Sequence, residues 1–505
     1  MDGAVGTYDA PTRLGIPGPI EVSQSCPIRA PVARARRHLE NDEAFGGMRN
    51  PLKAVTELGS RTLSEGLRTL TLRFLKEHPI ATSSMLRALG APQGTFDYEA
   101  PWIEELRRLW ADELGVDDTG AAKSATCSSP LRYSLLRAWA HLTKDPARSI
   151  VEWLVEGAPA GIARDIPDLG VFPTKSDDSD ISIAELDAIA GDLHNYDSLE
   201  QYVNADAVIA KLCDPAKEWV HTVKTVKEAR RILGGKPVIN PLGLVVKEKR
   251  DDEGLVISVK ERLILDAKRS RTNAAARARS RIVLPRLIDA VLRMLALCTA
   301  ALASNKDLLT SCSWLVLDFE DAYYLIPLHP EERRFHCARY KKDIIIFLRT
   351  GQGAKASSLT WAHMAALITR LTQSLYKQDE AALETYTDDP LLALLGTDEA
   401  HNDELAALAM ASWIVLGFRL AFHKGQRGRQ VTWIGASLTL LSGGLTVTVA
   451  EALWGEVRSS CEDIWRSNVV SAKVLQRVAG QANFIAGLIW TWRPFLAPLW
   501  AALSK

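Results

Sequence analysis

The sequence predicts an α+β protein with a helical first part and a mixed second part. Apolar residues between positions 51 and 160 recur every three to four residues, which is typical of helices that bury one face. From about residue 236 the pattern changes to short apolar runs separated by charges or turn residues, as in strands. A length of 505 residues, 47% of them hydrophobic and 24% charged, is enough for several packed cores.

The formal net charge of zero conceals an uneven distribution along the chain. Residues 161–210 carry eleven acidic and two basic side chains, a net charge of −9, whereas residues 221–290 carry seventeen basic and eight acidic ones, a net charge of +9. Because local fields bind phosphates, a polyanion would be drawn to the second stretch and repelled by the first. The zero average therefore does not exclude a nucleic-acid enzyme.

Cysteine usage and the absence of long apolar runs predict a soluble intracellular protein, without separating cytoplasm from nucleus. The seven cysteines include no C-x-x-C pair, so neither a disulfide framework nor a zinc finger is expected. The start, MDGAVGTYDAPTR, lacks the apolar core of a signal peptide. The longest apolar run, 484–492, ends at Arg493-Pro494, far short of a bilayer span, so we expect no membrane partner.

The first 235 residues show no catalytic pattern. Residues 1–50 are rich in Gly, Pro and Arg and predict a disordered arm, whose R-A-R-R cluster at 34–37 is either a nuclear address or, more often, a solvated run. Residues 51–160 predict a helical N-terminal region, and 161–235 an acidic linker with helices. The expected helical stripes are Leu63, Leu67, Leu70 and Phe74, followed by Ile103, Leu106, Leu109 and Trp110.

Four residues in this region match a known catalytic motif. Residues 118–121 spell D-T-G-A, as in retroviral aspartic proteases. Such a site needs an apolar strand that leads into the aspartate and holds two carboxylates together. The preceding A-D-E-L-G-V-D is instead polar, so we interpret these residues as a turn that terminates a helix.

The strongest signal for chemistry is W-L-V-L-D-F-E-D-A-Y-Y-L-I-P-L at 314–328. Four apolar residues lead into Asp318, which predicts a carboxylate at the end of a buried strand. Further on, apolar runs flank Asp388 and Asp389 in A-L-E-T-Y-T-D-D-P-L-L-A-L-L, the pattern of a hairpin with acidic residues at its turn. Taken alone, an Asp-Asp pair before a proline more often marks a surface turn.

If the strand and the hairpin lie side by side, the three aspartates share one pocket. Three carboxylates cannot all stay ionised there unless cations neutralise them. Mg²⁺ is the expected cation, because it prefers hard oxygen ligands and shares its coordination shell with substrate phosphates. Mn²⁺ could substitute for it.

These segments resemble motifs of reverse transcriptases. L-D-F-E-D-A-Y-Y-L-I-P-L is similar to their motif A, and Y-T-D-D at 386–389 looks like the Y-x-D-D of their motif C. The resemblance implies that Asp318 and Asp388 are the principal ligands of two Mg²⁺ ions and that Asp389 completes the site. It also implies that the ring of Tyr323 excludes a ribose 2′-hydroxyl.

The segment R-T-G-Q-G-A-K-A-S-S-L-T-W at 349–361 resembles motif B, a glycine-containing loop that opens a helix. By this resemblance Gln352 and Gly353 contact the incoming nucleotide and template. The apolar residues that follow at helical spacing are Met364, Leu367, Ile368, Leu371 and Leu375. The loop therefore precedes a helix N-terminus, which favours anions.

Upstream, E-R-L-I-L-D-A-K-R-S-R-T-N at 261–273 resembles the fingers strand R-x-x-x-D-x-R-x-x-N. Arg262 then matches the triphosphate-binding arginine, and either Lys247 or Lys249 supplies a second phosphate contact. The sequence departs from the pattern at Lys268 and Arg271. A basic surface hairpin is the alternative for each of these cations.

Downstream, L-G-F-R-L-A-F-H-K-G at 416–425 resembles motif D, which makes Lys424 a candidate proton donor to pyrophosphate or a phosphate contact. V-T-W-I-G-A-S-L at 431–438 resembles motif E, the primer grip, with Trp433, Ile434 and Gly435 at the matching positions.

The resemblance covers roughly 236–505 and implies a right-hand polymerase fold. Fingers and an antiparallel-sheet palm would occupy 236–440, and a thumb-like helical segment 441–505, whose part at 474–500 resembles retrotransposon polymerases. The implied activity is RNA-directed DNA synthesis on an RNA (or DNA) template with a DNA primer and deoxynucleoside triphosphates. Because few residues follow the thumb-like segment, we expect no ribonuclease H or integrase domain in this chain.

Departures from the family pattern keep alternatives open. Pro390 follows the aspartate pair, which a hairpin edge can tolerate, and R-T-G-Q-G replaces the common L-P-x-G. A decayed or co-opted retroelement protein that binds nucleic acid without catalysis is therefore the second hypothesis. An RNA-templated RNA polymerase would share the chemistry, but Tyr323 disfavours it. The sequence determines neither the element type nor the priming mechanism nor the oligomeric state.

Overall fold

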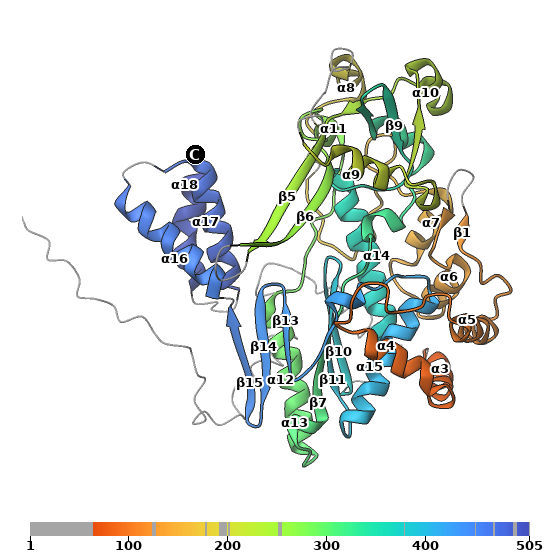
Figure 1. Cartoon of the computed structure of the whole chain (residues 1–505), viewed down its shortest axis with the longest axis vertical. Coiled ribbons are helices and arrows are strands. Elements are labelled where there is room, and N and C mark those ends of the chain that lie inside the picture. Colours follow the sequence, from red (N-terminus) through yellow and green to blue (C-terminus); the bar gives the residue numbers. More distant parts are fainter. Residues whose placement is uncertain are drawn as a thin grey trace, which may run out of the picture.

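The computed structural model describes residues 64–503 except for 124–127, 177–178, 191–198, 200–201, 251–254, 378, 450, 468–469 and 488–491. The expected arm at 1–50 and its basic cluster at 34–37 lie outside these residues. The described part mixes helices and sheets, which confirms the predicted α+β composition. No helix within it has the length and apolar character needed to cross a bilayer. Figure 1 shows a central body, an upper body with a projecting ribbon, and a C-terminal helical unit.

The first described helices pack on the central body. Their bounds are α3 (Glu65–Glu77), α4 (Pro79–Ala88), α5 (Pro101–Leu114) and α6 (Tyr133–Leu142). The expected stripes are used for packing, since Leu67, Phe74 and Trp110 are buried. Helices α3, α4 and α5 contact α15 (Glu399–Val415), and α6 contacts α14 (Lys355–Gln373). Short elements follow, namely β1 (Ala122–Lys123), β2 (Ser128–Ser129), the 3-10 helix η3 (Arg148–Glu152) and α7 (Trp153–Glu156).

Two ion pairs join this N-terminal region to the central body. Arg370 on α14 donates through Nε to Asp145 Oδ2 at 2.7 Å and through Nη2 to Asp145 Oδ1 at 2.8 Å, and both side chains are fully buried. Arg68 on α3 makes a similar two-pronged contact with Glu380, at 2.7 and 2.8 Å. The N-terminal helices are therefore an integral part of the central body.

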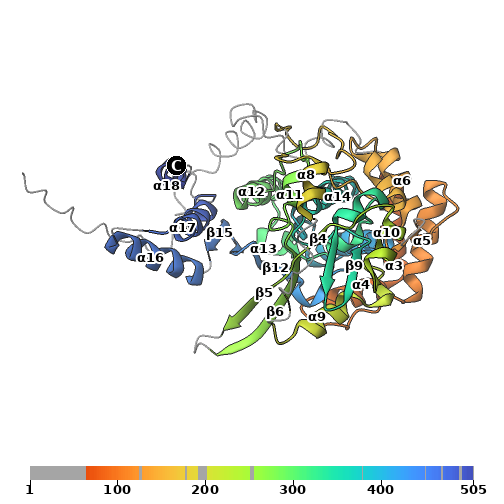
Figure 2. The same ribbon diagram turned by 90° about the horizontal axis from the view of Figure 1, so that it is seen from above.

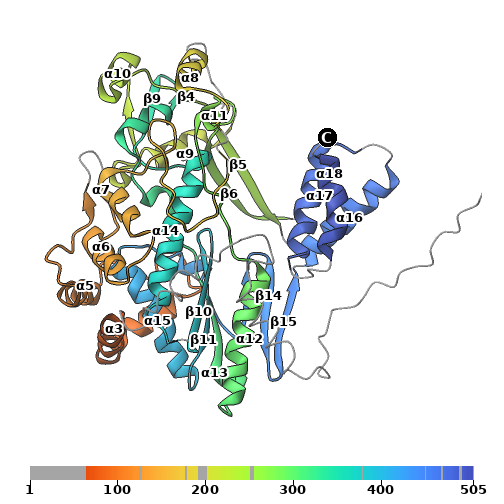
Figure 3. The same cartoon turned by 180° about the vertical axis from the view of Figure 1, so that it is seen from behind.

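The central body is built on a four-stranded antiparallel sheet with strand order β10-β11-β7-β12. The strands are β7 (Cys312–Val316), β10 (Ala381–Tyr386), β11 (Asp389–Leu395) and β12 (Gln426–Gly428). Alternate residues of the sheet face two different cores. Leu315 and Leu392 belong to the core with α14 and α15, whereas Trp314 and Leu391 belong to the core with α12 (Leu287–Ala303). Figure 3 shows α12 on one side of the sheet, followed by α13 (Leu308–Ser311).

The upper body contains a second sheet with strand order β3-β9-β8-β4. Its strands are β3 (Val220–Val223), β4 (Ile239–Asn240), β8 (Cys337–Tyr340) and β9 (Asp343–Phe347). Around it lie α8 (Ile183–Ala190), α9 (Ala205–Leu212), η4 (Pro215–Lys217), α10 (Val226–Leu233), α11 (Thr272–Ala275), η5 (Ala322–Leu325) and η6 (Pro330–Phe335). Because β3 pairs with β9, the region expected as a linker also contributes a strand to this sheet.

A two-stranded ribbon, β5 (Leu242–Arg250) and β6 (Val256–Leu265), projects from the upper body, as Figure 2 shows from above. Two of the short apolar runs that predicted separate strands after residue 236, 255–259 and 263–265, fall almost entirely on the single strand β6. The charged residues between these runs belong to the paired strand instead of forming a turn.

The C-terminal part begins with η7 (Phe422–Lys424) and a three-stranded sheet of β13 (Gln430–Trp433), β14 (Ala436–Leu441) and β15 (Gly444–Val449). Helices α16 (Glu451–Arg466), α17 (Ala472–Ile485) and α18 (Arg493–Leu503) form the C-terminal helical unit. The unit stands apart from the upper body across the ribbon in Figure 1.

Candidate active site

The end of β7 meets the tip of the β10–β11 hairpin, and this brings the three aspartates side by side. β11 pairs with β7 in antiparallel orientation. Beyond the paired residues, Leu317 N donates to Pro390 O at 3.1 Å and Phe319 N donates to Asp388 O at 2.8 Å. Asp318 lies between these two contacts, so its backbone is clamped against the hairpin tip.

The three carboxyl groups interact directly. The side chains of Asp318 and Asp389 share a hydrogen bond. Burial, reinforced by the charges of Asp388 and Asp318, raises the pKa of Asp389 to about 7. Burial and then the charge of Asp318 also raise the pKa of Asp388. At neutral pH Asp389 is therefore protonated in about half of the molecules, and a cation that offset the charge of the group would displace this proton.

Two basic side chains face this acidic group. Lys424 Nζ lies 2.6 Å from Asp318 Oδ2, and the turn that carries it is held because Ala421 N donates to Asp318 O at 2.8 Å. Arg262 on β6 lies near enough to act on Asp388 and Tyr323. Its positive charge lowers their pKa values, and burial raises them by a larger amount. The upper body thus contributes one cation to the acidic group.

The tip of the hairpin has an unusual backbone. Thr387 has a φ of 58°, in the left-handed region that a β-branched residue rarely adopts. Trp361 Nε1 on α14 donates a hydrogen bond of 2.8 Å to Thr387 O, which fixes the turn directly before Asp388. Sequence reasoning missed this contact, because no local pattern links a tryptophan to a turn so far along the chain.

The position of Pro390 corrects one expectation. It was expected at a hairpin edge, but β11 lies between β10 and β7 and is therefore an interior strand. Pro390 is the second residue of β11, and its carbonyl accepts the bond from Leu317, just past the end of β7. The proline is tolerated because it lies near the start of its strand, where few ladder bonds are lost.

Gln352 and Gly353 lie in the loop 351–354, immediately before α14. Gly353 has a φ of 105°, and a Cβ there would lie 2.1 Å from Leu265 O, so only glycine fits. Leu265 N donates to Gln352 O at 2.8 Å, which ties the loop to β6. Asn273 bridges the same loop, donating to Gly353 O at 3.0 Å and accepting from Lys355 N at 2.7 Å.

Tyr323 lies in η5, between the acidic group and α14. Its hydroxyl is hydrogen-bonded to Ser358, and burial raises its pKa. Its carbonyl accepts a 2.5 Å bond from Thr350 Oγ1, next to the glycine loop. Tyr323 is thus held at its hydroxyl and at its backbone carbonyl, and the charge of Asp388 acts on the hydroxyl.

Lys247 and Lys249 lie on β5, opposite Lys260 and Ser258 of β6. Their side chains are outside the described part of the structure. Arg262 pairs with Val245, closer to the base of the ribbon. The charge of Arg262 acts on Asp388 of the acidic group, whereas the phosphate contact expected of Lys247 or Lys249 falls on side chains that the structure does not describe.

Trp433 is the last residue of β13, and Ile434 and Gly435 form the turn that leads into β14. Ile434 and Gly435 have φ angles of 41° and 89°, which makes the turn tight. Trp433 Nε1 donates to Asp389 O at 3.0 Å, and its ring centroid lies 6.5 Å from that of Tyr386. This turn is therefore fixed to the aspartate hairpin, which the sequence did not indicate.

The donor set suits a hard divalent cation by its chemistry, because three carboxylates crowd together, the pKa values of Asp388 and Asp389 are raised, and oxygen ligands are those that Mg²⁺ prefers. The carboxylates are not arranged as a ready-made cage. Over the residues that the structure describes, no group of three or more His, Cys, Asp or Glu side chains is set up to hold a metal ion. Asp318 instead pairs with Lys424 and shares a hydrogen bond with Asp389.

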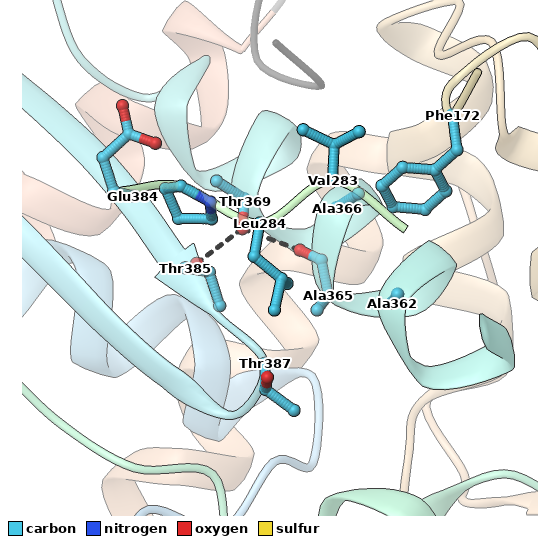
Figure 4. A pocket seen from close by; sticks show the side chains of 11 residues that line it. Phe172, Val283, Leu284, Ala362, Ala365, Ala366, Thr369, Glu384, Thr385 and Thr387 are labelled. Atoms are coloured by element: carbon cyan, nitrogen blue, oxygen red, sulfur yellow. Dashed lines mark hydrogen bonds between the residues drawn. The ribbon is translucent and has the colours of Figure 1, made fainter. Parts of the chain in front are cut away.

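A small pocket of about 40 Å³ lies behind the hairpin, between α14 and β10 (Figure 4). Residues from α14, from the hairpin and from the segment 283–285 line it. Thr369 and Thr385 share a 2.7 Å hydrogen bond across it, and the buried carboxyl of Glu384 lies at its side. The segment 283–285 therefore reaches the hairpin that carries the aspartates.

No protein-family model and no curated protein matches this chain. Among solved structures, the foamy viral protease-reverse transcriptase in complex with an RNA/DNA hybrid matches with a TM-score of 0.36 and 13% identity, over 80% of this chain and 43% of that one. A dRH form of that protein in complex with double-stranded DNA gives a TM-score of 0.34 and 13% identity, over 61% and 44%. The match thus spans less than half the length of these two chains, and a likeness at this level does not assign a family.

Proposed function

We propose that this chain is a retroelement reverse transcriptase, an RNA-directed DNA polymerase that extends a DNA primer on an RNA or DNA template. The observation that carries the proposal is the convergence of β7 and the β10–β11 hairpin. It gathers Asp318, Asp388 and Asp389, with Lys424 against the first of them. Such a crowded acidic group beside basic side chains suits the transfer of a nucleotide, which carries charge on its phosphates.

The three aspartates would hold two Mg²⁺ ions, which when bound lower the pKa of a primer hydroxyl and neutralise charge on the phosphates. The rigid mounting of the carboxylates supports this role. Backbone bonds clamp Asp318 to the hairpin, and the indoles of Trp361 and Trp433 fix the hairpin from either end of the Asp pair. Preorganised acidic groups avoid the cost of reorganisation during the reaction.

The incoming deoxynucleoside triphosphate would lie between the acidic group and β6. Arg262 would bind its phosphates through the guanidinium fork, with Lys247 or Lys249 as a second contact. Gln352 and Gly353 would contact the nucleotide and template, since Gly353 leaves room for close approach of a backbone. Tyr323 would exclude a 2′-hydroxyl sterically, a role supported by the two hydrogen bonds that hold its ring and backbone.

Once substrate is bound, Lys424 would leave its ion pair with Asp318 and contact the triphosphate instead. There it would donate a proton to the pyrophosphate leaving group or contact a phosphate. The turn of Trp433, Ile434 and Gly435 would hold the primer end, consistent with its attachment to Asp389. In this proposal the upper body and ribbon are the fingers, the central body is the palm, and the C-terminal helical unit is the thumb.

Primer extension on a homopolymer RNA template with Mg²⁺ tests the proposal. We expect extension by the unmodified chain, and at least a roughly thousandfold loss in Asp388→Asn, because several kcal/mol of transition-state stabilisation depend on this ligand. Template binding should persist in the variant. Asp112→Asn, which changes an exposed carboxylate on α5, is the matched control and should extend normally.

Two results would contradict the proposal. Binding without extension by the unmodified chain would favour the co-opted nucleic-acid-binding protein. Equal incorporation of ribo- and deoxynucleotides would favour an RNA-templated RNA polymerase and remove the role given to Tyr323.

A further inference from the structure

The turn that carries Lys424 is enclosed between the acidic group and a loop of the N-terminal region. Residues 419–425, here called the lysine turn, lie between α15 and β12. On one side, Ala421 N donates to Asp318 O at 2.8 Å, which binds the turn to the end of the strand. On the other side the turn meets residues 89–98, here called the N-terminal loop, which lie between α4 and α5.

Tyr98 of the N-terminal loop binds the backbone of the lysine turn through one hydroxyl group. This hydroxyl donates to Leu420 O at 2.9 Å and accepts from Leu420 N at 2.7 Å. Leu420 is only 1% exposed, so little water reaches these two backbone groups. Burial raises the pKa of Tyr98, which keeps the hydroxyl protonated and able to donate. The two bonds therefore fix both the position and the orientation of one peptide in the turn.

Further contacts between the two segments do not involve this hydroxyl. Gly90 N donates to Phe422 O at 2.8 Å, and the ring centroid of Phe96 lies 4.6 Å from that of Phe422. The guanidinium of Arg419 lies over the ring of Tyr98, 4.9 Å from its centroid. A phenylalanine at position 98 would keep these packing contacts and lose only the two hydrogen bonds.

The N-terminal loop also approaches the chain directly after Lys424. A Cβ on Gly425 would lie 2.6 Å from Leu89 Cδ2, so the loop passes close to the backbone at this point. The loop thus contacts the lysine turn at residues before and after Lys424 in the sequence.

This enclosure determines where the ammonium group of Lys424 can reach. Lys424 Nζ lies 2.6 Å from Asp318 Oδ2. Because the charge of a lysine stands at the end of a flexible four-carbon chain, its position depends on a backbone that is held in place. Misplacement of a catalytic group by about 1 Å can lower a rate about a hundredfold.

We propose that the N-terminal loop, through the hydroxyl of Tyr98, positions Lys424 to act on the pyrophosphate leaving group. This inference rests on the proposed polymerase function and assigns a part in it to the N-terminal region. Tyr98 acts through the backbone of Leu420, four residues before Lys424, and is therefore a positioning residue. Since the lysine would act as the leaving group departs, a displaced turn should slow the chemical step more than it weakens nucleotide binding.

Addition of a single nucleotide under single-turnover conditions tests the proposal. The substrates are a DNA primer annealed to a homopolymer RNA template, Mg²⁺ and the complementary deoxynucleoside triphosphate. Tyr98→Phe should lower the maximal rate of addition about tenfold and change the Kd of the nucleotide less than about twofold. Tyr133→Phe is the matched control, because it removes a hydroxyl that donates to Glu152 Oε2 at 2.6 Å elsewhere in the N-terminal region. It should leave the rate unchanged.

A double-mutant cycle separates positioning of Lys424 from a general structural role. In the Lys424→Met background, Tyr98→Phe should lower the rate less than about twofold, because no ammonium group remains for the turn to position. A role confined to the stability of the turn or of the acidic group would instead lower the rate by the same factor in both backgrounds.

Labelling of lysine amines with an acetylating reagent, measured by peptide mass spectrometry on the full chain, needs no polymerase activity. The side chain of Lys424 is 40% exposed and paired with Asp318, so its labelling rate reports how firmly it is held. Tyr98→Phe should speed labelling of Lys424 several-fold through local opening of the turn. Labelling of Lys227, exposed on α10, should not change.

Equal rate losses in the two backgrounds, a loss confined to the nucleotide Kd, or unchanged labelling of Lys424 would each overturn the assignment. If the unmodified chain does not extend primers, the polymerase proposal fails. The labelling experiment then still decides whether Tyr98 positions Lys424.

Discussion

The buried ion pair between Asp145 and Arg370 allows a quantitative test of how the N-terminal region supports the active-site helix. Asp145→Asn removes the negative charge that pairs with the guanidinium of Arg370 on α14, and both side chains are fully buried. Breaking a buried pair from one side costs about 3–5 kcal/mol, because the remaining charge keeps its desolvation penalty. We expect the free energy of unfolding to fall by that amount, measured by urea denaturation with tryptophan fluorescence.

Two comparisons isolate the cause. Glu462→Gln breaks the exposed pair with Arg458 on α16, whose side chains are 50% and 59% exposed, and should cost less than about 1 kcal/mol. Asp145→Leu/Arg370→Met removes both buried charges and should be less destabilising than Asp145→Asn alone. If Asp145→Asn is as mild as Glu462→Gln, the pair does not anchor α14 and the reasoning fails.

Three more predictions concern the hairpin and the loops around it. Burial raises the pKa of Glu384 from 4.5 to about 7, so the folded state binds a proton more tightly and the free energy of unfolding falls as pH rises between these values. Glu384→Gln should remove about 3 kcal/mol of this pH dependence. The unfolding curves of the variant at pH 5 and pH 8 should therefore differ less than those of the unmodified chain. Gly353→Ala should lower the free energy of unfolding by about 1–3 kcal/mol more than Gly428→Ala, because both glycines have positive φ but only at Gly353 would the added Cβ meet a backbone carbonyl. Equal melting temperatures of the two variants would refute this. Tyr323→Ala should raise ribonucleotide incorporation relative to deoxynucleotides about ten- to a hundredfold in competition assays, and an unchanged ratio would remove its gating role.

The acidic group could be predicted because its signals are local. Four apolar residues before Asp318 indicate a buried strand, and two apolar runs around Asp388 and Asp389 indicate a hairpin. Period and turn chemistry are properties of neighbouring residues, so sequence reasoning reaches them. That the two elements would pair was an inference from resemblance, and the register between β7 and β11 agrees with it.

The contacts that position the group were beyond sequence reasoning. Periodicity shows that one face of α3 or α5 is buried, but not that α15 covers it. The indole bonds of Trp361 and Trp433 and the ion pair of Lys424 join residues that only the folded chain brings together. The interior position of Pro390 was missed for the same reason, since strand order is a tertiary property.

The N-terminal helices have a consequence for biosynthesis. Ser64 bonds to Ser374 at 2.6 Å across 310 residues of sequence. At about 5–20 residues per second, a ribosome needs roughly 15–60 s to supply that partner. During this time the apolar stripes of α3 and α5 emerge without their cover, so nascent chains should engage chaperones. Fragments that start near residue 236 would leave the matching face of α15 bare and should aggregate.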